Sequence, residues 1–325
     1  MRLDVSTESW PIAGTFTISR GSKTAADVVV ATVSDGQFSG RGECVPYPRY
    51  GESIAGALET LDALKDAVGK GLTRDMLMAD TPPGAARNAL DCALLDFEAK
   101  ASRRPAHEIL GLPEPAAITT AFTLSLGEPA AMADAARSAS TRPLLKLKLG
   151  PDGALARVRA VHDAAPAAAL ILDANEAWSV ETLNSLTPQL AALGVVLIEQ
   201  PLPAGADDAL AEVRSPIPLC ADESLHGIES LRHLCSGYQY LNIKLDKTGG
   251  LTEAVLVARE AISRGLGIMV GCMVSTSLGM APAFALTPLA RFVDLDGPLL
   301  LARDREPAIR YDGSIMQPPP RALWG

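Results

Sequence analysis

The second half of the chain repeats one pattern, a short apolar, β-prone run that ends in polar or charged residues and is followed by an Ala- and Leu-rich segment with helical periodicity. Eight such runs recur at intervals of roughly 21 to 27 residues, the length of one strand-plus-helix unit. The runs are Ile118–Ser125, Leu144–Leu149, Ala169–Asn175, Val195–Gln200, Leu219–Glu223, Tyr240–Asp246, Gly267–Cys272 and Phe292–Asp296. Eight units predict a TIM-like barrel, and no clear helix follows the last run, so the barrel is expected to lack its final helix. An open doubly wound sheet is the alternative, but it does not require a polar residue at the end of almost every strand.

The residues before the repeat have a different pattern. Three segments alternate like antiparallel strands, and two longer segments with helical periodicity follow them. The expected strands are Thr15–Ser19, Val28–Val33 and Gly40–Cys44, and the expected helices are Ile54–Val68 and Ala85–Ala101. Strands followed by helices indicate a separate α+β domain. We therefore expect an α+β domain over residues 1–115, a barrel over 116–298 and a tail over 299–325 that packs back toward the first domain.

Composition excludes several classes of protein. With 29 basic and 38 acidic residues the formal net charge is −9, and aromatic residues are 4% of the chain, which argues against a nucleic-acid-binding protein. The uncharged stretch Gly265–Ala290 is long enough to span a bilayer, but its glycines and Pro282 favour a buried strand, loop and helix, so no membrane contact is expected. Five cysteines without a CxxC pair are typical of reduced thiols in a cytoplasmic protein.

Two lysines share one face of the second run. Because residues i and i+2 of a strand point the same way, Lys146 and Lys148 point together, with leucines on the other face. In a barrel the lysines would point inward, which is costly unless opposite charge compensates them. An edge strand with both lysines in solvent is the alternative.

Three successive runs end in an acid, in the order Asp173, Glu199 and Asp222. At a barrel mouth these carboxylates would converge and repel one another, so they require a cation. An all-oxygen set of ligands suits Mg²⁺. Solvated strand ends or helix caps are the alternative for each acid alone.

Lys244 ends the sixth run, and strands two and six lie opposite each other in an eight-stranded barrel. Lys148 and Lys244 would then face each other across the metal site. Partial burial and a neighbouring cation lower the pKa of a lysine, so we expect both to act as bases. One base on each side of a carbon, with a cation on an adjacent carboxylate, removes a proton from one face and returns one to the other.

Asp294 and Asp296 end the eighth run and share a face. Two further inward acids need a positive partner, and a protonated substrate amine is one candidate. A second metal site and a solvated strand end are the alternatives.

These motifs, in this order, resemble the enolase superfamily and its muconate-lactonizing subgroup: KxK at Lys146, DxN at Asp173, EQP at Glu199, DES at Asp222 and KxD at Lys244. The resemblance implies a (β/α)₇β barrel with an α+β capping domain, one Mg²⁺ per subunit, and lysine bases acting with a metal-stabilised enediolate. Within the subgroup the chain is most similar to dipeptide epimerases, especially those acting on L-Ala-D/L-Glu. The DxD at Asp294 and the sequence NIKLDKTGGL from Asn242 carry that similarity.

The resemblance also implies substrate contacts. Asp294 and Asp296 would hold a dipeptide's ammonium group, and specificity loops are expected near residues 18–24 and 46–53. The further contacts implied are Arg20, Tyr47, Thr123, Lys146, Cys272 and Met273. Arg20 is expected to pair with an acidic side chain of the substrate, since arginine offers a bidentate fork, and Arg49 and Lys23 are rivals for that role.

The expected reaction is a Mg²⁺-dependent 1,1-proton transfer at the α-carbon of a dipeptide's C-terminal residue, an isomerase reaction suited to cell-wall peptide recycling. N-acylamino-acid racemase and o-succinylbenzoate synthase are alternatives with the same lysines and metal, although their substrates carry no free amine. A Schiff-base lyase is the alternative from another class, and it would need one desolvated lysine and no acidic cage. The dipeptide is the only partner expected, and the sequence leaves a homo-oligomer open.

Overall fold

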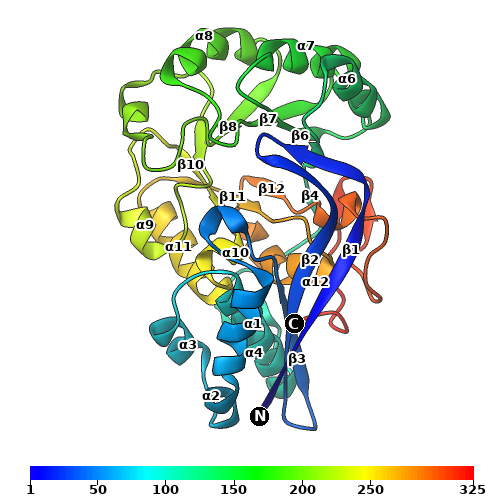
Figure 1. Cartoon of the computed structure of the whole chain (residues 1–325), viewed down its shortest axis with the longest axis vertical. Coiled ribbons are helices and arrows are strands. Elements are labelled where there is room, and N and C mark those ends of the chain that lie inside the picture. The colour runs from blue at the N-terminus through cyan, green and yellow to red at the C-terminus, as the bar shows by residue number, and fades with distance from the viewer.

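The computed structural model describes residues 1–325, and its N-terminal part is built on a three-stranded antiparallel sheet (Figure 1). The sheet order is β1 (Arg2–Ile18), β2 (Gly21–Ser34) and β3 (Ser39–Cys44). Five helices follow, namely α1 (Ile54–Ala63), α2 (Lys65–Gly69), α3 (Arg74–Asp80), α4 (Ala85–Ser102) and α5 (Ala106–Ile109). This arrangement agrees with the expected α+β part. The predicted helix over Ile54–Val68 is broken at Leu64, whose backbone N–H turns back to Leu61.

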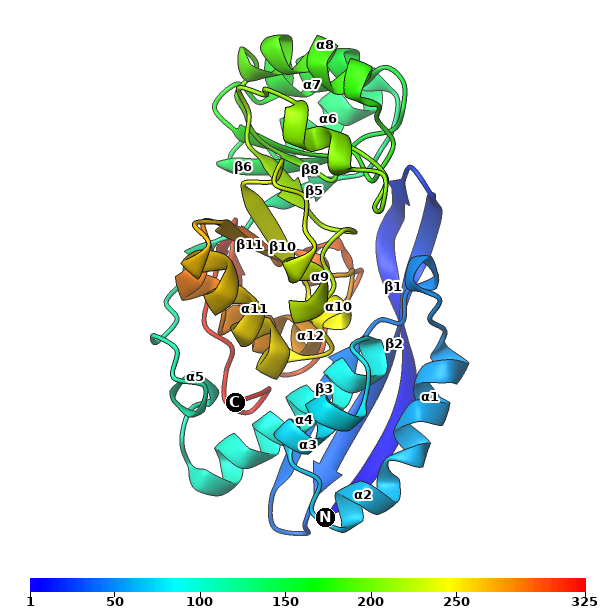
Figure 2. The same cartoon turned by 90° about the vertical axis from the view of Figure 1, so that its left-hand side faces the viewer.

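The β1–β2 hairpin is much longer than the short strand predicted at Thr15–Ser19. It runs along the length of the molecule, and its turn reaches the barrel (Figures 1 and 2). Only Leu3 and Val5 alternate with polar residues at the start of β1, and the polar stretch Ser6–Ser9 follows them. This apolar pattern is too short to indicate a strand of the observed length.

Eight parallel strands form the barrel sheet, in the order β12-β11-β10-β9-β8-β7-β6-β5. They are β5 (Phe122–Leu124), β6 (Leu144–Lys148), β7 (Ala169–Asp173), β8 (Val195–Glu199), β9 (Leu219–Ala221), β10 (Tyr240–Ile243), β11 (Gly267–Gly271) and β12 (Phe292–Asp294). The Ala121 N–H donates to the Val293 carbonyl across the gap between β5 and β12, at 2.8 Å. The predicted eight-stranded barrel is confirmed.

Helices cover the outside of the barrel between the strands. They are α6 (Pro129–Ser138), α7 (Ala154–Ala164), α8 (Val180–Ala191), α9 (Ile228–Arg232), α10 (Leu245–Thr248), α11 (Leu251–Ser263) and α12 (Ser277–Phe284). Only a 3₁₀ turn, Asp208–Glu212, connects β8 to β9, and only the turn Gly297–Leu300 follows β12. The barrel therefore lacks its last helix, as the sequence predicts, and the β8–β9 connection also contains no α-helix.

The run Ile118–Ser125 forms two strands instead of one. β4 (Ile118–Thr119) pairs with β14 (Ile315–Met316) of the tail, which also pairs with β13 (Tyr311–Asp312). Only the second half of the run, β5, enters the barrel. The uncharged stretch Gly265–Ala290 forms β11, a loop and α12, and none of the helices has the length and apolar character needed to cross a membrane.

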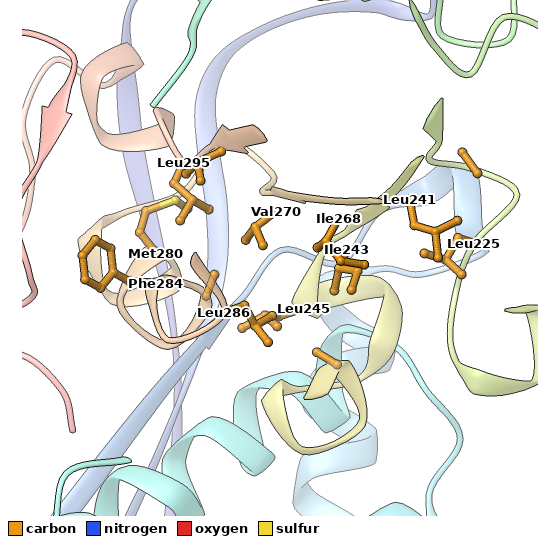
Figure 3. Packing of buried hydrophobic residues seen from close by; sticks show 14 of the residues in the cluster. Leu225, Leu241, Ile243, Leu245, Ile268, Val270, Met280, Phe284, Leu286 and Leu295 are labelled. Carbon is orange, nitrogen blue, oxygen red and sulfur yellow. The ribbon is translucent and has the colours of Figure 1, made fainter. Parts of the chain in front are cut away.

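Alternation along the strands separates the core from the barrel mouth. In β10, Ile243 lies beside Ile268 and Leu241 lies beside Leu225, within the same apolar cluster as Val270 and the side chains of α12 (Figure 3). Asn242, between Leu241 and Ile243 in the strand, points into the barrel. The barrel floor is a small apolar cluster of Ile171, Leu197, Cys220 and Met269, contributed by β7, β8, β9 and β11. Polar side chains are thereby confined to the carboxyl ends of the strands.

Close packing and the tail join the N-terminal part to the barrel. Trp324 is buried, its indole N–H donates to the Cys92 carbonyl of α4, and the Gly325 N–H donates to Asp96. Arg305 of the tail forms ion pairs with Glu43 of β3 and Glu8 of β1. The limits 115 and 298 for the domains remain predictions.

Strand β3 lies so close to α4 that two of its positions have no room for a side chain. A Cβ at Gly42 would lie 2.1 Å from the Ala89 carbonyl oxygen, and one at Gly40 would lie 2.1 Å from the Phe97 nitrogen. We expect Gly42→Ala to lower the free energy of unfolding by about 1–3 kcal/mol or more, because the helix must shift. The matched control is Gly127→Ala, whose Cβ would make only ordinary contacts, the nearest at 3.7 Å. Thermal unfolding followed by circular dichroism measures both, and equal transition temperatures for the two variants would contradict this account of the β3–α4 contact.

Candidate active site

A cavity of about 460 Å³ lies between the carboxyl ends of the barrel strands and the N-terminal part of the chain. Its barrel wall includes Lys148, Lys244 and Asp222. Its other wall comes from the turn of the β1–β2 hairpin and from the loop around the 3₁₀ turn Pro48–Tyr50, the two segments predicted as specificity loops.

The three predicted metal ligands meet in the structure. Asp173 ends β7, Glu199 ends β8, and Asp222 follows β9. Strand register places Asp173 directly beside Glu199, and one carboxylate oxygen from each of the three acids lies within 4.8 Å of the others. All three residues are buried, with at most 1% of their surface exposed, so the alternative of solvated strand ends is wrong.

Four buried lysines surround this acidic triad. Lys148 pairs with Asp173 at 2.5 Å, Lys244 pairs with Asp222 at 2.5 Å, and Lys146 lies 2.7 Å from Glu199. Both lysines of β6 therefore point into the barrel, and the edge-strand alternative is wrong. Lys148 and Lys244 belong to strands that are four apart in the sheet order, as predicted for opposite sides of a mouth.

Lys247 is the fourth lysine, and the sequence reasoning missed it. It lies in α10, is 1% exposed, and contacts Asp222 Oδ1 at 2.6 Å as well as the carbonyl oxygens of Asp222 and Asn242. Its place three residues after Lys244 was visible in the motif, but only the turn of α10 shows that both ammonium groups reach one carboxylate.

The charges of the triad are strongly coupled to these lysines. Burial alone would raise the pKa of each carboxyl group, but Lys148 and Lys146 bring the pKa of Asp173 down to about 2. Lys244 and Lys247 likewise hold the pKa of Asp222 well below its usual range against the effect of burial. Burial and the neighbouring Asp173 raise the pKa of Glu199 to about 7.

The expectation of a lowered lysine pKa is not met at Lys244. Burial does act to lower it, but Asp222 and Glu199 outweigh burial and raise the pKa of Lys244 well above its ordinary value. The reason is that, in the metal-free protein, the carboxylates of the triad face the lysines and no bound cation offsets their negative charge.

Polar side chains next to the triad fix its geometry. The Gln200 side chain accepts the N–H of Asp222 at 2.8 Å and donates to Ser224 and Tyr238, and its own backbone has a φ of +37°. Asn242 donates to Glu199 Oε1 at 2.8 Å. Both residues stand in motifs that the sequence analysis noted, but their roles depend on backbone turns that a residue pattern does not show.

The triad fits a hard divalent cation. All its donors are carboxylate oxygens, and Glu199 Oε2 accepts no hydrogen bond although it is buried and near Lys146. Buried Asn175 Oδ1, beside Asp173, also lacks a partner. Buried oxygens that accept no hydrogen bond are rare in folded proteins, and carboxylate and amide oxygens are ligands that suit Mg²⁺.

Asp294 and Asp296 lie close together at the end of the eighth strand, but they have different partners. Lys146 binds Asp294 at 2.7 Å, while Asp296 accepts the Thr123 backbone N–H at 2.6 Å. Burial and the charge of Asp294 raise the pKa of Asp296 to about 7. Asp294 therefore already has a cation, Asp296 has none, and neither lines the cavity.

The remaining predicted substrate contacts divide into two groups. Arg20, Tyr47, Cys272 and Met273 line the cavity. Thr123 and Lys146 are buried and do not line it; Lys146 is 1% exposed and is held among three carboxylates. The structure therefore places Lys146 beneath the triad, between Glu199 and Asp294.

The pairing pattern predicts that two of the acids contribute differently to the stability of the metal-free protein. Asp222→Asn leaves both Lys244 and Lys247 without their charged partner, so we expect the free energy of unfolding to fall by about 3–5 kcal/mol. Glu199→Gln removes the carboxylate that burial and Asp173 already disfavour, so we expect no loss. Chemical denaturation in the presence of EDTA measures both, and equal destabilisation by the two amides would contradict the assignment.

Comparison with known proteins agrees with this site. Residues 1–111 match the mandelate racemase / muconate lactonizing enzyme N-terminal domain family, and residues 129–320 match the enolase C-terminal domain-like family. An L-Ala-D/L-Glu epimerase of Escherichia coli (strain K12) is 45% identical over 306 residues, covering 94% of this chain and 95% of that protein. An N-acetyl-D-glutamate racemase of Pseudoalteromonas sp is 47% identical over 302 residues, covering 92% and 95%.

Solved structures give the same result. An enolase family member from Agrobacterium tumefaciens with homology to dipeptide epimerases, holding sodium and L-Ala-L-Glu, is 52% identical with a TM-score of 0.97 and covers 100% of this chain and 99% of its own. A dipeptide epimerase from Methylococcus capsulatus, complexed with Mg and L-Arg-D-Lys, is 28% identical with a TM-score of 0.90 and covers 100% and 99%. The expected resemblance is confirmed: the chain belongs to the mandelate racemase / muconate lactonizing enzyme family of the enolase superfamily, among its dipeptide epimerases.

Proposed function

We propose that the protein is a Mg²⁺-dependent dipeptide epimerase that moves a proton at the α-carbon of the C-terminal residue. One observation carries the proposal: two lysines from opposite strands, Lys148 and Lys244, line one cavity on either side of a buried acidic triad. A site for epimerisation needs a proton acceptor on one face of a carbon and a proton donor on the other.

The side chains divide the work as follows. The lysine on one face takes the α-proton as a neutral amine, and the lysine on the opposite face returns a proton as an ammonium. Asp173 and Asp222 orient the two lysines through their ion pairs at 2.5 Å. Because the roles exchange with the substrate's configuration, the same two residues serve both directions.

Asp173, Glu199 and Asp222 would hold one Mg²⁺ per subunit, as the relative from Methylococcus capsulatus supports. When bound, the ion supplies a Lewis acid that draws charge from the substrate's carboxylate and makes the α-proton more acidic. A bound cation would also compensate the triad, whose negative charge raises the pKa of Lys244 in the metal-free protein.

The substrate we propose is L-Ala-L-Glu and its epimer L-Ala-D-Glu. The Escherichia coli relative and the Agrobacterium tumefaciens structure with L-Ala-L-Glu support this choice. Asp296 is the buried acid without a cationic partner, so it is the group best suited to a dipeptide's ammonium. A cytoplasmic role in cell-wall peptide recycling is compatible with this substrate and remains a prediction.

A second candidate is racemisation of an N-acylated glutamate. The Pseudoalteromonas relative, an N-acetyl-D-glutamate racemase, favours it, and so does the ion pair between Lys146 and Asp294. Because Lys146 already compensates the charge of Asp294, only Asp296 still needs a positive partner such as a substrate ammonium. The Schiff-base alternative is not supported, because both candidate lysines are tied to carboxylates.

The two-base arrangement predicts complementary losses. Lys148→Ala and Lys244→Ala should each abolish epimerisation of L-Ala-L-Glu, because one face loses its proton carrier. In D₂O, each variant should retain deuterium exchange with one epimer only, and the retained epimer should differ between the two. Mass spectrometry of the substrate pools measures this.

Circular dichroism confirms that each variant is folded, and EDTA treatment of the unaltered protein serves as the metal control. Chelation should stop exchange with both epimers, and added Mg²⁺ should restore it. Epimerisation by either lysine variant, or by the chelated protein, would contradict the proposed mechanism.

The ammonium assignment predicts a preference for free-amine substrates. The kcat/KM for L-Ala-L-Glu should exceed that for N-acetyl-L-glutamate and for N-acetyl-L-Ala-L-Glu, because only the first brings a cation to Asp296. A lost desolvated charge pair typically costs about 2–5 kcal/mol, or roughly thirty-fold to several-thousand-fold in kcat/KM. Asp296→Asn should narrow the gap by harming the dipeptide most. Equal values for the free and acetylated substrates would favour the racemase instead.

A further inference from the structure

The segment after Lys244 contains an acid and a pair of glycines, Asp246 and Gly249-Gly250, that take no part in the proposed reaction. This segment forms α10, in which the N–H groups of Lys247 and Thr248 donate to the Lys244 carbonyl at 3.0 and 3.1 Å. A helix of four residues is not stable in isolation, so its geometry must come from its contacts. The contacts are with α4 of the N-terminal part (Figure 2).

The first turn of α10 is held through Asp246. One oxygen of this buried carboxylate accepts the side-chain amide of Asn88 at 2.9 Å and the backbone N–H of Val45 at 3.0 Å. Asn88 lies in α4, is 3% exposed, and donates to the Glu43 carbonyl as well. The residue two places after Lys244 is therefore tied to both β3 and α4.

The end of α10 is held by Arg87, one residue before Asn88 in α4. Its guanidinium donates to the Thr248 carbonyl at 2.7 Å and to the Gly249 carbonyl at 3.0 Å, and it pairs with Glu253 of α11. The last carbonyl groups of a helix have no partner within the helix, so a buried cation at this end both satisfies and fixes them.

The two glycines give the side chains of α4 the space they need. Both have a positive φ, and a Cβ at Gly249 would lie 2.3 Å from Arg87 Nε, while one at Gly250 would lie 2.4 Å from Asp91 Oδ2. Asp91, one turn after Arg87 in α4, accepts the N–H of Thr252 at 3.0 Å and its hydroxyl at 2.5 Å. One face of α4 thus fixes the chain from Asp246 to the start of α11.

The opposite lysine has no such support. Lys148 ends β6, where strand pairing places it beside Asp173, and the next N–H, of Leu149, donates to the Asp173 carbonyl at 2.9 Å. The hydrogen bonds from α4 to the barrel go to residues 246–253. α4 therefore contacts the segment that carries one of the two lysines and not the segment that carries the other.

We propose that Arg87, Asn88 and Asp91 are positioning residues for Lys244: they fix α10 and thereby set proton transfer on the face of the substrate that Lys244 serves. Transfer on the face that Lys148 serves does not depend on them. The inference rests on the proposed dipeptide epimerase function, and it gives the N-terminal part a role in the chemical step in addition to its role as a cavity wall.

Variants with one of the two lysines separate the two faces. In Lys148→Ala only Lys244 can exchange the α-proton with D₂O, and in Lys244→Ala only Lys148 can. Adding Asn88→Ala should lower the exchange rate about 10- to 100-fold in the first background and less than about three-fold in the second, because a small displacement of a proton-carrying group is costly. Rates are measured at saturating Mg²⁺ and dipeptide, so that weaker binding of either does not contribute.

Asp96→Ala is the matched control. Asp96 is also a buried polar residue of α4, but its carboxylate accepts the N–H of Arg41 at 2.8 Å and that of Gly325 at 2.7 Å, in β3 and the tail. It should change both rates by the same factor. Equal losses from Asn88→Ala in the two backgrounds, or no loss in either, would overturn the proposal.

Backbone amide exchange supplies a measurement that needs no substrate. With both lysines present, Asn88→Ala should speed amide exchange in the peptide 244–250 at least about five-fold and leave the peptide 144–150 unchanged, since only the first loses an anchor. Unchanged amide exchange at 244–250 would also overturn the proposal. If amide exchange rises there but neither lysine background exchanges the α-proton of any dipeptide, the two-base function has failed, while the fixing of α10 by α4 stands.

Discussion

The rest of the site depends on the mutual compensation of charge at the barrel mouth. Buried carboxylates and buried ammonium groups are each costly in isolation, and here they meet in a cluster that water hardly reaches. Asp222 with two lysines is over-compensated, whereas Glu199 carries an unsatisfied oxygen and an elevated pKa. Positive and negative charge are therefore unevenly balanced within the metal-free cluster. A divalent cation bound to the three carboxylates would change how strongly each carboxylate interacts with its lysines, as well as adding positive charge.

The N-terminal part completes the cavity because its sheet is fixed at both ends. At one end β3 packs directly on α4, which requires Gly40 and Gly42. At the other end the β1–β2 hairpin reaches across to the barrel, where Arg20 meets residues that follow β7 and β9 (Figures 1 and 2). Lys148 and Lys244 therefore come from a part of the chain that is at least 95 residues away from the two loops predicted to contact the substrate, residues 18–24 and 46–53.

Those features of the fold and site that depend on strand periodicity and on the order of the motifs along the chain could be predicted from the sequence. The repeats, each ending in polar residues, predict the eight strands, the meeting of the three acids and the placement of Lys148 and Lys244 on opposite strands. The structure confirms all three. The sequence could not predict what depends on helical turns and loop closure. Lys247 reaches Asp222 only because α10 begins at once after β10. In the long β1–β2 hairpin, the apolar alternation at the start of β1 is limited to Leu3 and Val5. The sequence prediction of a lowered lysine pKa includes the bound cation, whereas in the metal-free protein the facing carboxylates raise the pKa of Lys244.

The fastening of the hairpin has a kinetic consequence. Its turn is held to the barrel by ion pairs and a carbonyl contact, not by a large apolar surface, so the closed state is maintained by forces that dissolved ions screen. Opening of loops for product release often limits the rate of an enzyme, and the ion pairs at the hairpin turn oppose such opening here. Ionic strength therefore acts on the dwell time of the closed cavity. A protein closed in this way is tuned to the salt concentration in which it works as well as to its substrate.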